Sequence, residues 1–528
     1  MSDPDPSPVS LLSRYRAGIL FLGVTLGILL IQSLTGVWTS DIGADPDEPA
    51  HAVTSLMVRD YLAKGLGQSP LTFAQQYYEA FPKVALGHYP PGYYAMAGLV
   101  LLPWPQPPVL FMLQAVFTGL LALQVYFIGR RILRDFSAMA AAILSAAFPV
   151  TLKLTQLVMA DLMLACLCLL AVQFWVRFLE KPNFRWALLF GGTAAAAILT
   201  KGSGLALALV PAVTVLALHR WDLLKKPAFW AAGLPVGLLA GPWMLYSSKI
   251  TKEGMVSSGV MDFALGAVTY YGSVLSTSFG FVTVMMAVPG LALWLELTKF
   301  KLRPDARRTA LLGLLVGTVL IMLFIPTGYS SRYFMPVVPV VALLAVSFFD
   351  FTLSKTPLGR FGIISLVLLV VFQVPYLLVK NVHGFRSAIM QALEKPTSGG
   401  ITHWLVCADP RGEGALIASA AFALHSRSPS SLQMHRASKE LAATDWLGRD
   451  YKPTFDSPEA LLAYLDQTAI SHVFVHVTTE GESPSAHEEL LLKALRSQPS
   501  RWTLESSVAI TRPYQLAPGP LEVYVRKP

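Results

Sequence analysis

Charged residues are scarce in this chain. Asp, Glu, Lys and Arg together make up 14% of the 528 residues, whereas 54% of the residues are hydrophobic. A soluble globular domain carries roughly 25% charged residues. The shortage of charge therefore excludes a wholly soluble protein and indicates an integral membrane protein with most of its mass in the bilayer.

Cysteine is also scarce, with three residues in the whole chain. Cys166 and Cys168 lie two positions apart in one apolar run, so on a helix they would face different directions. Cys407 has no evident partner in the sequence. The sequence predicts no disulfide and no metal–thiolate site.

A polybasic tract is missing too, although the formal net charge is +9. Most Lys and Arg residues lie in short loops between apolar runs, where such residues orient membrane proteins. We therefore expect a lipid bilayer, and no nucleic acid, as a partner. The apolar run near the N-terminus is about 20 residues long and lacks a cleavage site of small residues, so it predicts an uncleaved anchor.

Apolar runs long enough to span a bilayer recur along the chain and predict about eleven transmembrane helices. They lie near residues 17–37, 108–129, 136–152, 160–179, 186–200, 203–219, 228–246, 273–297, 309–325, 334–350 and 361–379. The apolar run 93–103 is about half as long as a span and is bounded by prolines. It predicts a helix that lies at the membrane interface.

The loop charges predict an orientation. With a cytoplasmic N-terminus, the inner loops carry most of the basic residues, such as the cluster Arg130, Arg131 and Arg134, and the outer loops carry few. This orientation places the long loop 38–107, and the tail after about residue 380, on the outer side. The basic inner loops and the lack of cysteine pairs favour a multi-pass protein of a bacterial inner membrane with a periplasmic C-terminal domain.

The tail is more polar than the rest and shows alternating patterns. "HWLVCAD" and "SHVFVHV" are typical of strands, and "GEGALIASAAFALHS" and "SAHEELLLKALRSQ" are typical of helices. The predicted fold class is thus an α-helical polytopic membrane domain over residues 1–380, followed by a soluble α/β domain over residues 381–528.

Polar residues at a membrane edge cost free energy, so each one needs a reason. In the predicted topology, six polar features from distant segments gather on the outer side. They are Asp47-Glu48 with His51, His88-Tyr89, Lys153, Asp161, Lys201 in "LTKGSG" and Arg332 in "YSSRYFMPVVP".

The ordered set "DPDEPAHAV", "HYPPGYY", a lone Asp that opens the fourth helix, "TKG" and "RYFMPVVP" resembles the GT-C glycosyltransferases. The similarity covers roughly residues 10–350 and is to the branch with the bacterial aminoarabinose transferases and protein O-mannosyltransferases. "HYPPGYY" is similar to the "HPP" of the mannosyltransferases with one residue inserted. The acidic–lysine pair that the aminoarabinose transferases have nearby is not reproduced by His88-Tyr89.

The resemblance implies an enzyme that moves a sugar from a polyprenyl-phosphate donor to an acceptor glycan, lipid or protein on the outer face. Asp47 resembles the family's catalytic acidic residue, and we interpret it as the general base, with a pKa raised by the dry membrane rim. A single in-line attack would invert the anomeric carbon. The remaining expected roles are catalytic for Glu48 and Asp161, binding of the donor phosphate for Lys201, Arg332 and Tyr333, and binding of substrate for His51, His88 and Tyr89.

Other readings stay open from the sequence. The two acids at 47–48 could simply begin a helix, Asp161 could cap one, and Lys201 could reach from a helix end to the interface. Arg332 could anchor the interface, and the histidines could be structural. No cofactor is required, although Asp47 and His51 leave a divalent metal as an alternative. The rival functions are a ligase for lipid-linked oligosaccharides and a lipid or sugar transporter.

Overall fold

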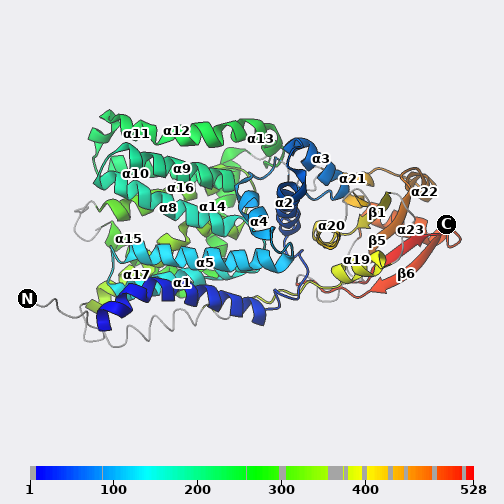
Figure 1. The fold of residues 1–528 in the computed structure, drawn as a ribbon, viewed down its shortest axis with the longest axis horizontal. Helices are drawn as coiled ribbons and strands as arrows, with labels where there is room; N and C mark the ends of the chain where they lie inside the picture. The colour runs from blue at the N-terminus through cyan, green and yellow to red at the C-terminus, as the bar shows by residue number, and fades with distance from the viewer. Residues whose placement is uncertain are drawn as a thin grey trace, which may run out of the picture.

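The structure is a computed structural model that describes residues 8–85, 87–256, 259–295, 305–354, 373, 378–394, 401–425, 432–444, 450–478, 484–513 and 519–527. A bundle of helices forms one part of the molecule, and a sheet covered by helices forms the other (Figure 1). The N-terminus lies at the far end of the bundle, and the C-terminus lies at the far end of the sheet domain.

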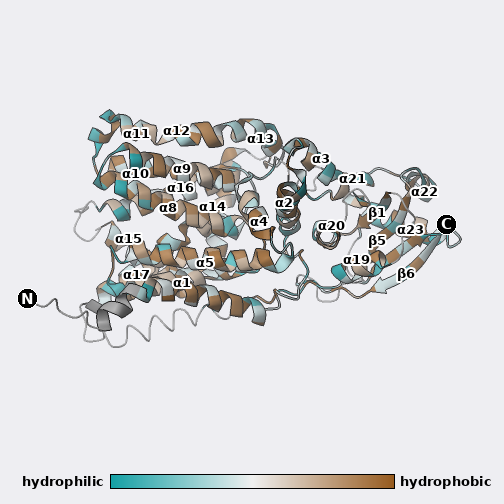
Figure 2. Cartoon of the chain, in the orientation of Figure 1, coloured by the Kyte–Doolittle hydropathy of each residue, from teal (hydrophilic) through white to brown (hydrophobic). Residues whose placement is uncertain are grey.

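Six helical segments in the described residues are long and apolar enough to cross a membrane. They match predicted spans, and apolar residues run along them (Figure 2). Four contain α1 (Pro8–Leu34), α5 (Pro107–Gly129), α8 (Asp161–Glu180) and α16 (Ala306–Phe324). One joins η5 (Ser331–Val337) to α17 (Val338–Ser354), and one joins α11 (Pro227–Ala231), α12 (Gly233–Pro235), η4 (Val236–Ala240) and α13 (Gly241–Glu253).

Two further predicted spans are broken. Helices α6 (Asp135–Ala147) and α7 (Pro149–Thr155) meet at 57°, because a residue before proline disfavours the helical conformation. The single helix predicted over 273–297 is wrong, since α14 (Val260–Phe279) and α15 (Phe281–Trp294) meet at 107°. Gly280 makes this turn with a φ of +77°, a conformation that favours glycine.

Shorter apolar helices complete the bundle. They are α9 (Phe184–Thr200), η2 (Gly202–Ala208) and α10 (Leu209–Ala217). They occupy the predicted spans 186–200 and 203–219 but are each shorter than a full span. The eleventh predicted span, 361–379, lies almost entirely outside the described residues.

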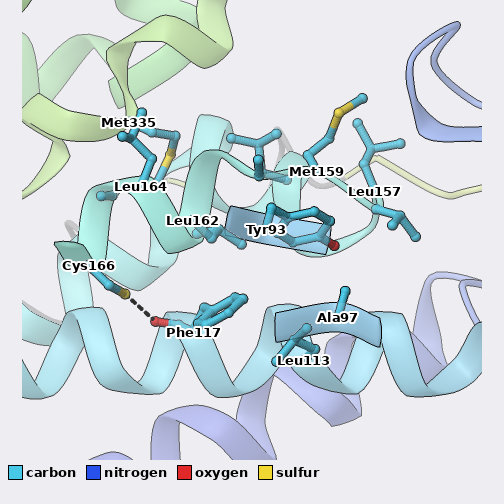
Figure 3. Close-up of a cluster of buried hydrophobic side chains, with 14 of the residues drawn as sticks. Tyr93, Ala97, Leu113, Phe117, Leu157, Met159, Leu162, Leu164, Cys166 and Met335 are labelled. Carbon is cyan, nitrogen blue, oxygen red and sulfur yellow. Dashed lines mark hydrogen bonds between the residues drawn. The ribbon is translucent and has the colours of Figure 1, made fainter. Parts of the chain in front are cut away.

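The loop between α1 and α5 is itself helical. It contains α2 (Glu48–Asp60), η1 (Tyr61–Gly65), α3 (Pro70–Ala80) and α4 (Gly92–Leu101). Helices α2 and α3 lie between the bundle and the sheet domain (Figure 1). The prediction of a short helix near 93–103 is confirmed, because α4 has ten residues. Helix α4 packs against α2, α5 and α9, and its Tyr93 and Ala97 belong to one buried hydrophobic cluster with Leu113, Phe117 and Leu162 (Figure 3).

The C-terminal region contains a five-stranded sheet of order β2-β1-β5-β7-β6. Strands β2, β1 and β5 are parallel, whereas β7 is antiparallel to β5 and to β6. The predicted strands and helices are present, and β2 adds a strand that the pattern did not predict. The bounds are β1 (Thr402–Cys407), β2 (Leu432–Arg436), β5 (Ile470–His476), β6 (Trp502–Val508) and β7 (Leu521–Arg526), with a small ladder of β3 (Ala442–Ala443) and β4 (Lys452–Pro453).

Five helices accompany this sheet. They are α19 (Phe385–Leu393), α20 (Pro410–Leu424), α21 (Ala437–Glu440), α22 (Pro458–Gln467) and α23 (Ala486–Ser497). Helix α20 packs against α2 of the long loop. Ser457 caps the start of α22, because its side chain accepts a hydrogen bond from the Ala460 amide.

Candidate active site at the α2 end of the bundle

Asp47 stands directly before α2 and meets residues from two distant segments. Its Oδ2 atom accepts hydrogen bonds from Arg332 Nη2 at 2.5 Å and from the Tyr89 hydroxyl at 2.9 Å. A second contact joins Arg332 Nη1 to Asp45 Oδ1 at 3.8 Å. The Asp47 side chain makes no capping hydrogen bond to α2, so these contacts do not support a role as a helix cap.

The pKa of Asp47 is shifted downward, whereas the sequence predicted an upward shift. Burial raises this pKa, but the charge of Arg332 and the hydrogen bonds from Arg332 and Tyr89 outweigh burial. The pKa therefore lies well below its usual value, and the expected upward shift is wrong. Asp47 is ionised in this arrangement, and its Oδ2 atom accepts hydrogen bonds from both Arg332 and Tyr89.

Glu48 points into a different environment from Asp47. Its side chain is fully buried, and its Oε1 atom lies 2.5 Å from Lys380 Nζ. Its Oε2 atom accepts hydrogen bonds from the backbone amides of Gly43 and Ala44 at 2.9 and 3.0 Å. Glu48 thus fixes the loop that carries Asp47, and these contacts favour a positioning role over the expected catalytic one.

Lys380 is a site residue that the sequence analysis missed. It lies 332 positions from Glu48 and is 1% exposed in its side chain. Its ammonium group also lies 4.3 Å from the centre of the Phe111 ring. The only sequence signal was a single lysine at the end of an apolar run, and that signal is equally typical of an interfacial anchor.

A second ion pair joins Asp161 to Lys201. Lys201 Nζ donates to Asp161 Oδ1 at 2.6 Å, and both side chains are buried. Asp161 Oδ2 has no hydrogen-bond partner among the described residues. Lys201 therefore does not extend into solvent, and Asp161 directs its carboxylate at a cation in the interior.

Tyr333 lies between the two ion pairs. Its ring centre is 4.9 Å from Lys201 Nζ and 5.8 Å from Arg332 Cζ. A cation over an aromatic ring within about 6 Å is attracted to the ring face. Tyr333 thereby brings the two predicted phosphate-binding cations to one place.

His51 belongs to an aromatic cluster behind Asp47. Its Nδ1 atom lies 2.9 Å from the Tyr94 hydroxyl, and its ring centre lies 4.6 Å from that of Tyr89. Burial lowers the pKa of His51 to about 4, so the imidazole is neutral at pH 7. Among the described residues, no group of three potential metal ligands includes Asp47 or His51. These contacts favour a structural role for His51 over the expected contact with substrate.

A cavity of about 450 Å³ begins beside these residues. His88, Tyr89, Lys201 and Tyr333 line its polar part. Its other walls are mostly apolar and include Leu205, Trp243, Met244, Ile321, Met322 and Ile325. Asp47 and Arg332 do not line this cavity, but both contact residues that do. Lys153, another of the six predicted polar features, has an exposed side chain and does not line the cavity.

Solved structures confirm the expected fold, a helical membrane bundle of the GT-C type. ArnT from Cupriavidus metallidurans, bound to undecaprenyl phosphate, is similar with a TM-score of 0.58 at 14% identity over 88% of this chain and 96% of that one. Its apo state covers 97% and 98% of the two chains at 13% identity, also with a TM-score of 0.58. The oligosaccharyltransferase AglB from Archaeoglobus fulgidus, in complex with an inhibitory peptide and a dolichol-phosphate, is similar with a TM-score of 0.53 at 12% identity over 88% of this chain and 70% of that one.

Part of the chain also matches a known protein family by sequence. Residues 90–246 match the family of dolichyl-phosphate-mannose-protein mannosyltransferases. This segment contains the end of "HYPPGYY", Asp161 and Lys201. No curated protein matches the chain by sequence. Together these findings confirm the expected fold and show a sequence similarity to that mannosyltransferase family over residues 90–246.

Proposed function

We propose that this protein transfers a sugar from a polyprenyl-phosphate donor to an acceptor at the outer face of the membrane. The main support is that buried Lys201 and half-buried Arg332 both lie within 6 Å of the Tyr333 ring centre, and that Lys201 and Tyr333 line the polar end of an apolar cavity. A ligand with an anionic head and an apolar tail matches this combination. The structural similarity to proteins bound to undecaprenyl phosphate and dolichol-phosphate supports the same donor class.

The cations have a defined task in this reaction. When the bond between the sugar and the phosphate breaks, the departing polyprenyl phosphate gains a second negative charge. Lys201 and Arg332 would stabilise that charge from fixed positions in a site of low dielectric constant, often the largest contribution to catalysis. Each cation is held by a carboxylate before the donor binds, so the donor phosphate would compete with Asp161 and Asp47 for them.

This competition gives Asp47 its proposed role as the general base. The charge of Arg332 is the main influence that lowers the pKa of Asp47 against burial. A phosphate that attracts Arg332 would weaken that pair, and burial would then raise the pKa of Asp47 toward the working pH. Donor binding would thus prepare Asp47 to accept the proton of the acceptor hydroxyl, which attacks in line and inverts the anomeric carbon.

Asp161 holds Lys201 in place, and the hydroxyl of Tyr89 orients Asp47. His88 lines the same cavity and is placed to contact the sugar or the phosphate. The reaction needs no cofactor, because charge stabilisation and proton transfer come from these side chains.

The test is turnover of defined donors by the purified full-length protein. We expect release of polyprenyl phosphate from a polyprenyl-phosphate sugar when a suitable acceptor is present, and slow release by water when it is absent. Turnover of diphosphate-linked oligosaccharides alone would instead favour the ligase alternative, for which the similarity to an oligosaccharyltransferase is the supporting observation. Movement of an intact donor across a vesicle membrane without cleavage would favour a transporter and contradict the proposal.

A further inference from the structure

A second cluster of reactive side chains lies inside the sheet domain, far along the chain from Asp47. Cys407 is the last residue of β1, and His487 and Glu488 lie in the first turn of α23 (Figure 1). The thiol sulfur, one ring nitrogen and one carboxylate oxygen all lie within 4.8 Å of one another. Among the described residues, this is the one group of three such side chains that could hold a metal ion.

His487 is the most informative member of the cluster. The residue is 6% exposed, and its Nδ1 atom lies 3.0 Å from the Tyr451 hydroxyl. Its Nε2 atom is buried and has no hydrogen-bond partner among the described residues. A buried nitrogen without a partner is unfavourable and often marks a missing ion or water. A hydrogen bond at Nδ1 that leaves Nε2 open is the usual arrangement of a metal-binding histidine.

The other two side chains are also suited to bind an ion. Cys407 is fully buried. The Oε2 atom of Glu488 accepts a hydrogen bond from the Ser485 amide at 2.9 Å, which fixes the carboxylate and leaves its second oxygen available. Ligands of parallel sheets bind at the carboxyl ends of strands where the chain connections diverge. Cys407 lies at such a place, because the chain passes from β1 to β2 on one side and later to β5 on the other.

We propose that Cys407, His487 and Glu488 bind one zinc ion that links β1 to α23. A thiolate with an imidazole selects zinc over magnesium or calcium. The thiolate and the carboxylate together carry two negative charges, so a zinc ion makes the buried cluster neutral. Ligand atoms around a tetrahedral zinc ion lie roughly 3.3–3.7 Å apart, so the three atoms, which lie within 4.8 Å of one another, need to close by no more than about 1.5 Å. Binding releases the thiol proton of Cys407, and water completes the coordination.

The test is zinc binding by the full-length protein after removal of metals with a chelator. We expect one zinc ion per chain and a zinc-dependent rise in the thermal unfolding temperature. With cobalt in place of zinc, a thiolate-to-metal absorption band should appear. Cys407→Ser and His487→Gln should both lose zinc binding. Cys407→Ser should also lose the thiolate-to-metal absorption band. Cys166→Ser changes another buried cysteine, outside the cluster, and should keep both zinc binding and the absorption band.

Tyr451→Phe provides a variant that keeps every proposed ligand. It removes the hydrogen bond to Nδ1 of His487 and should weaken zinc binding about 10- to 100-fold. If Cys407→Ser does not fold, the zinc affinity of Tyr451→Phe still tests the proposal. Wild-type protein that takes up no stoichiometric zinc, or binding that is equal in wild type, Cys407→Ser and Tyr451→Phe, would overturn the proposal.

Discussion

The charged side chains around Asp47 form ion pairs. Some of these pairs belong to the proposed reaction, whereas another holds the loop in place. Asp47 and Asp161 each face a cation beside the cavity, whereas Glu48 faces Lys380 and two backbone amides. Neighbouring acids at 47 and 48 therefore have different tasks, because successive residues at the start of a helix point about 100° apart.

Asp47→Asn should stop transfer and spare donor binding. The change keeps the shape of the side chain but removes the proton acceptor, so transfer should fall by at least about 10²-fold. Lys201 remains in place to bind the phosphate. Single-turnover transfer from a labelled donor, measured beside equilibrium donor binding, checks both parts. Near-normal transfer would remove Asp47 from the role of base.

Lys201→Ala and Arg332→Ala should each weaken donor binding or turnover. A hydrogen bond between a charged group and a phosphate contributes about 1.5–3 kcal/mol, which corresponds to roughly 10- to 150-fold. Lys153→Ala is a matched control, because its side chain is exposed. If both cation variants bind and react like wild type, the proposed phosphate site is wrong.

Glu48→Gln should act on stability more than on chemistry. It leaves the Lys380 charge buried without its partner, and loss of one partner of a buried pair costs about 3–5 kcal/mol. Lys380→Met should be similarly damaging, whereas the double variant should lose less than the sum of the two. Thermal unfolding of the four proteins tests this coupling. Additive losses would show that the two side chains do not act as a pair.

His51 should make the protein less stable as the pH falls. Its pKa is about 4 in the folded chain against about 6.5 when unfolded, so the unfolded state binds the proton first. Its contribution is complete above pH ~6.5 and is lost progressively down to pH ~4. Unfolding temperatures across this range should fall more for wild type than for His51→Gln. Parallel curves would mean that His51 is not buried and neutral.

Residue types alone indicated the convergence of Asp47, Asp161, Lys201 and Arg332 on one face. They did not indicate which acid would pair with which base, because the Asp47–Arg332 pair spans 285 positions and the Glu48–Lys380 pair spans 332. The cluster of Cys407 with His487 was invisible for the same reason, since spacing rules for metal sites detect ligands that are close in sequence.

At the scale of elements, hydrophobic length predicted most helices, and local backbone chemistry decided where they break. The bends at Phe148–Pro149 and at Gly280 divide two predicted spans. A proline or glycine inside an apolar run permits a bend but does not require one, so the 107° turn between α14 and α15 depends on packing that the sequence pattern does not contain. The strand β2 was missed because it has five residues and a mixed pattern.

Helix α20 should control the position of the Asp47 loop. A Cβ atom at Gly414 would lie 2.8 Å from Pro49 Cγ and 3.0 Å from Lys83 Cε, so the side chains at this contact would have to move. Lys83 also donates to the Pro410 carbonyl at 3.3 Å, which joins α20 to the loop a second time. The sheet domain is therefore expected to support the loop that carries Asp47.

Gly414→Ala should consequently lower turnover or stability through overpacking, which typically costs about 1–3 kcal/mol. Gly192→Ala on α9 is the matched control, because no atom lies within 4 Å of its added Cβ. Alanine is a better helix former than glycine by about 1 kcal/mol, so the control should be neutral or stabilising. Turnover and thermal unfolding of both variants check the prediction, and a normal Gly414→Ala protein would show that the α20 contact yields easily.

The whole molecule has one end rich in basic residues, and this end determines the expected orientation. Ion pairs at this end, away from the sheet domain, join the start of α1 to that of α6, the loop between α5 and α6 to the end of α17, and the start of α16 to the end of α8 (Figure 1). The pairs are Arg16–Asp135 at 2.6 Å, Arg134–Asp350 at 2.7 Å and Arg307–Glu180. Basic residues in short loops remain on the cytoplasmic side. The sheet domain and the Asp47 site should then lie outside, where a lipid-linked donor would present its sugar.

A reporter enzyme that is active only outside the cytoplasm tests this orientation. Fused after Pro528, it should be active, because the sheet domain and the C-terminus lie beyond the end of the bundle that carries α2. Fused after Arg134, it should be inactive, since that residue belongs to the basic end. The second fusion is the sharper one, because α4 precedes it, and ten residues make a helix of about 15 Å against a hydrocarbon core of about 30 Å. Activity after Arg134 would mean that α4 crosses the membrane, which would contradict the eleven-span topology, or that the bundle is inverted, which would move the Asp47 site away from the outer face.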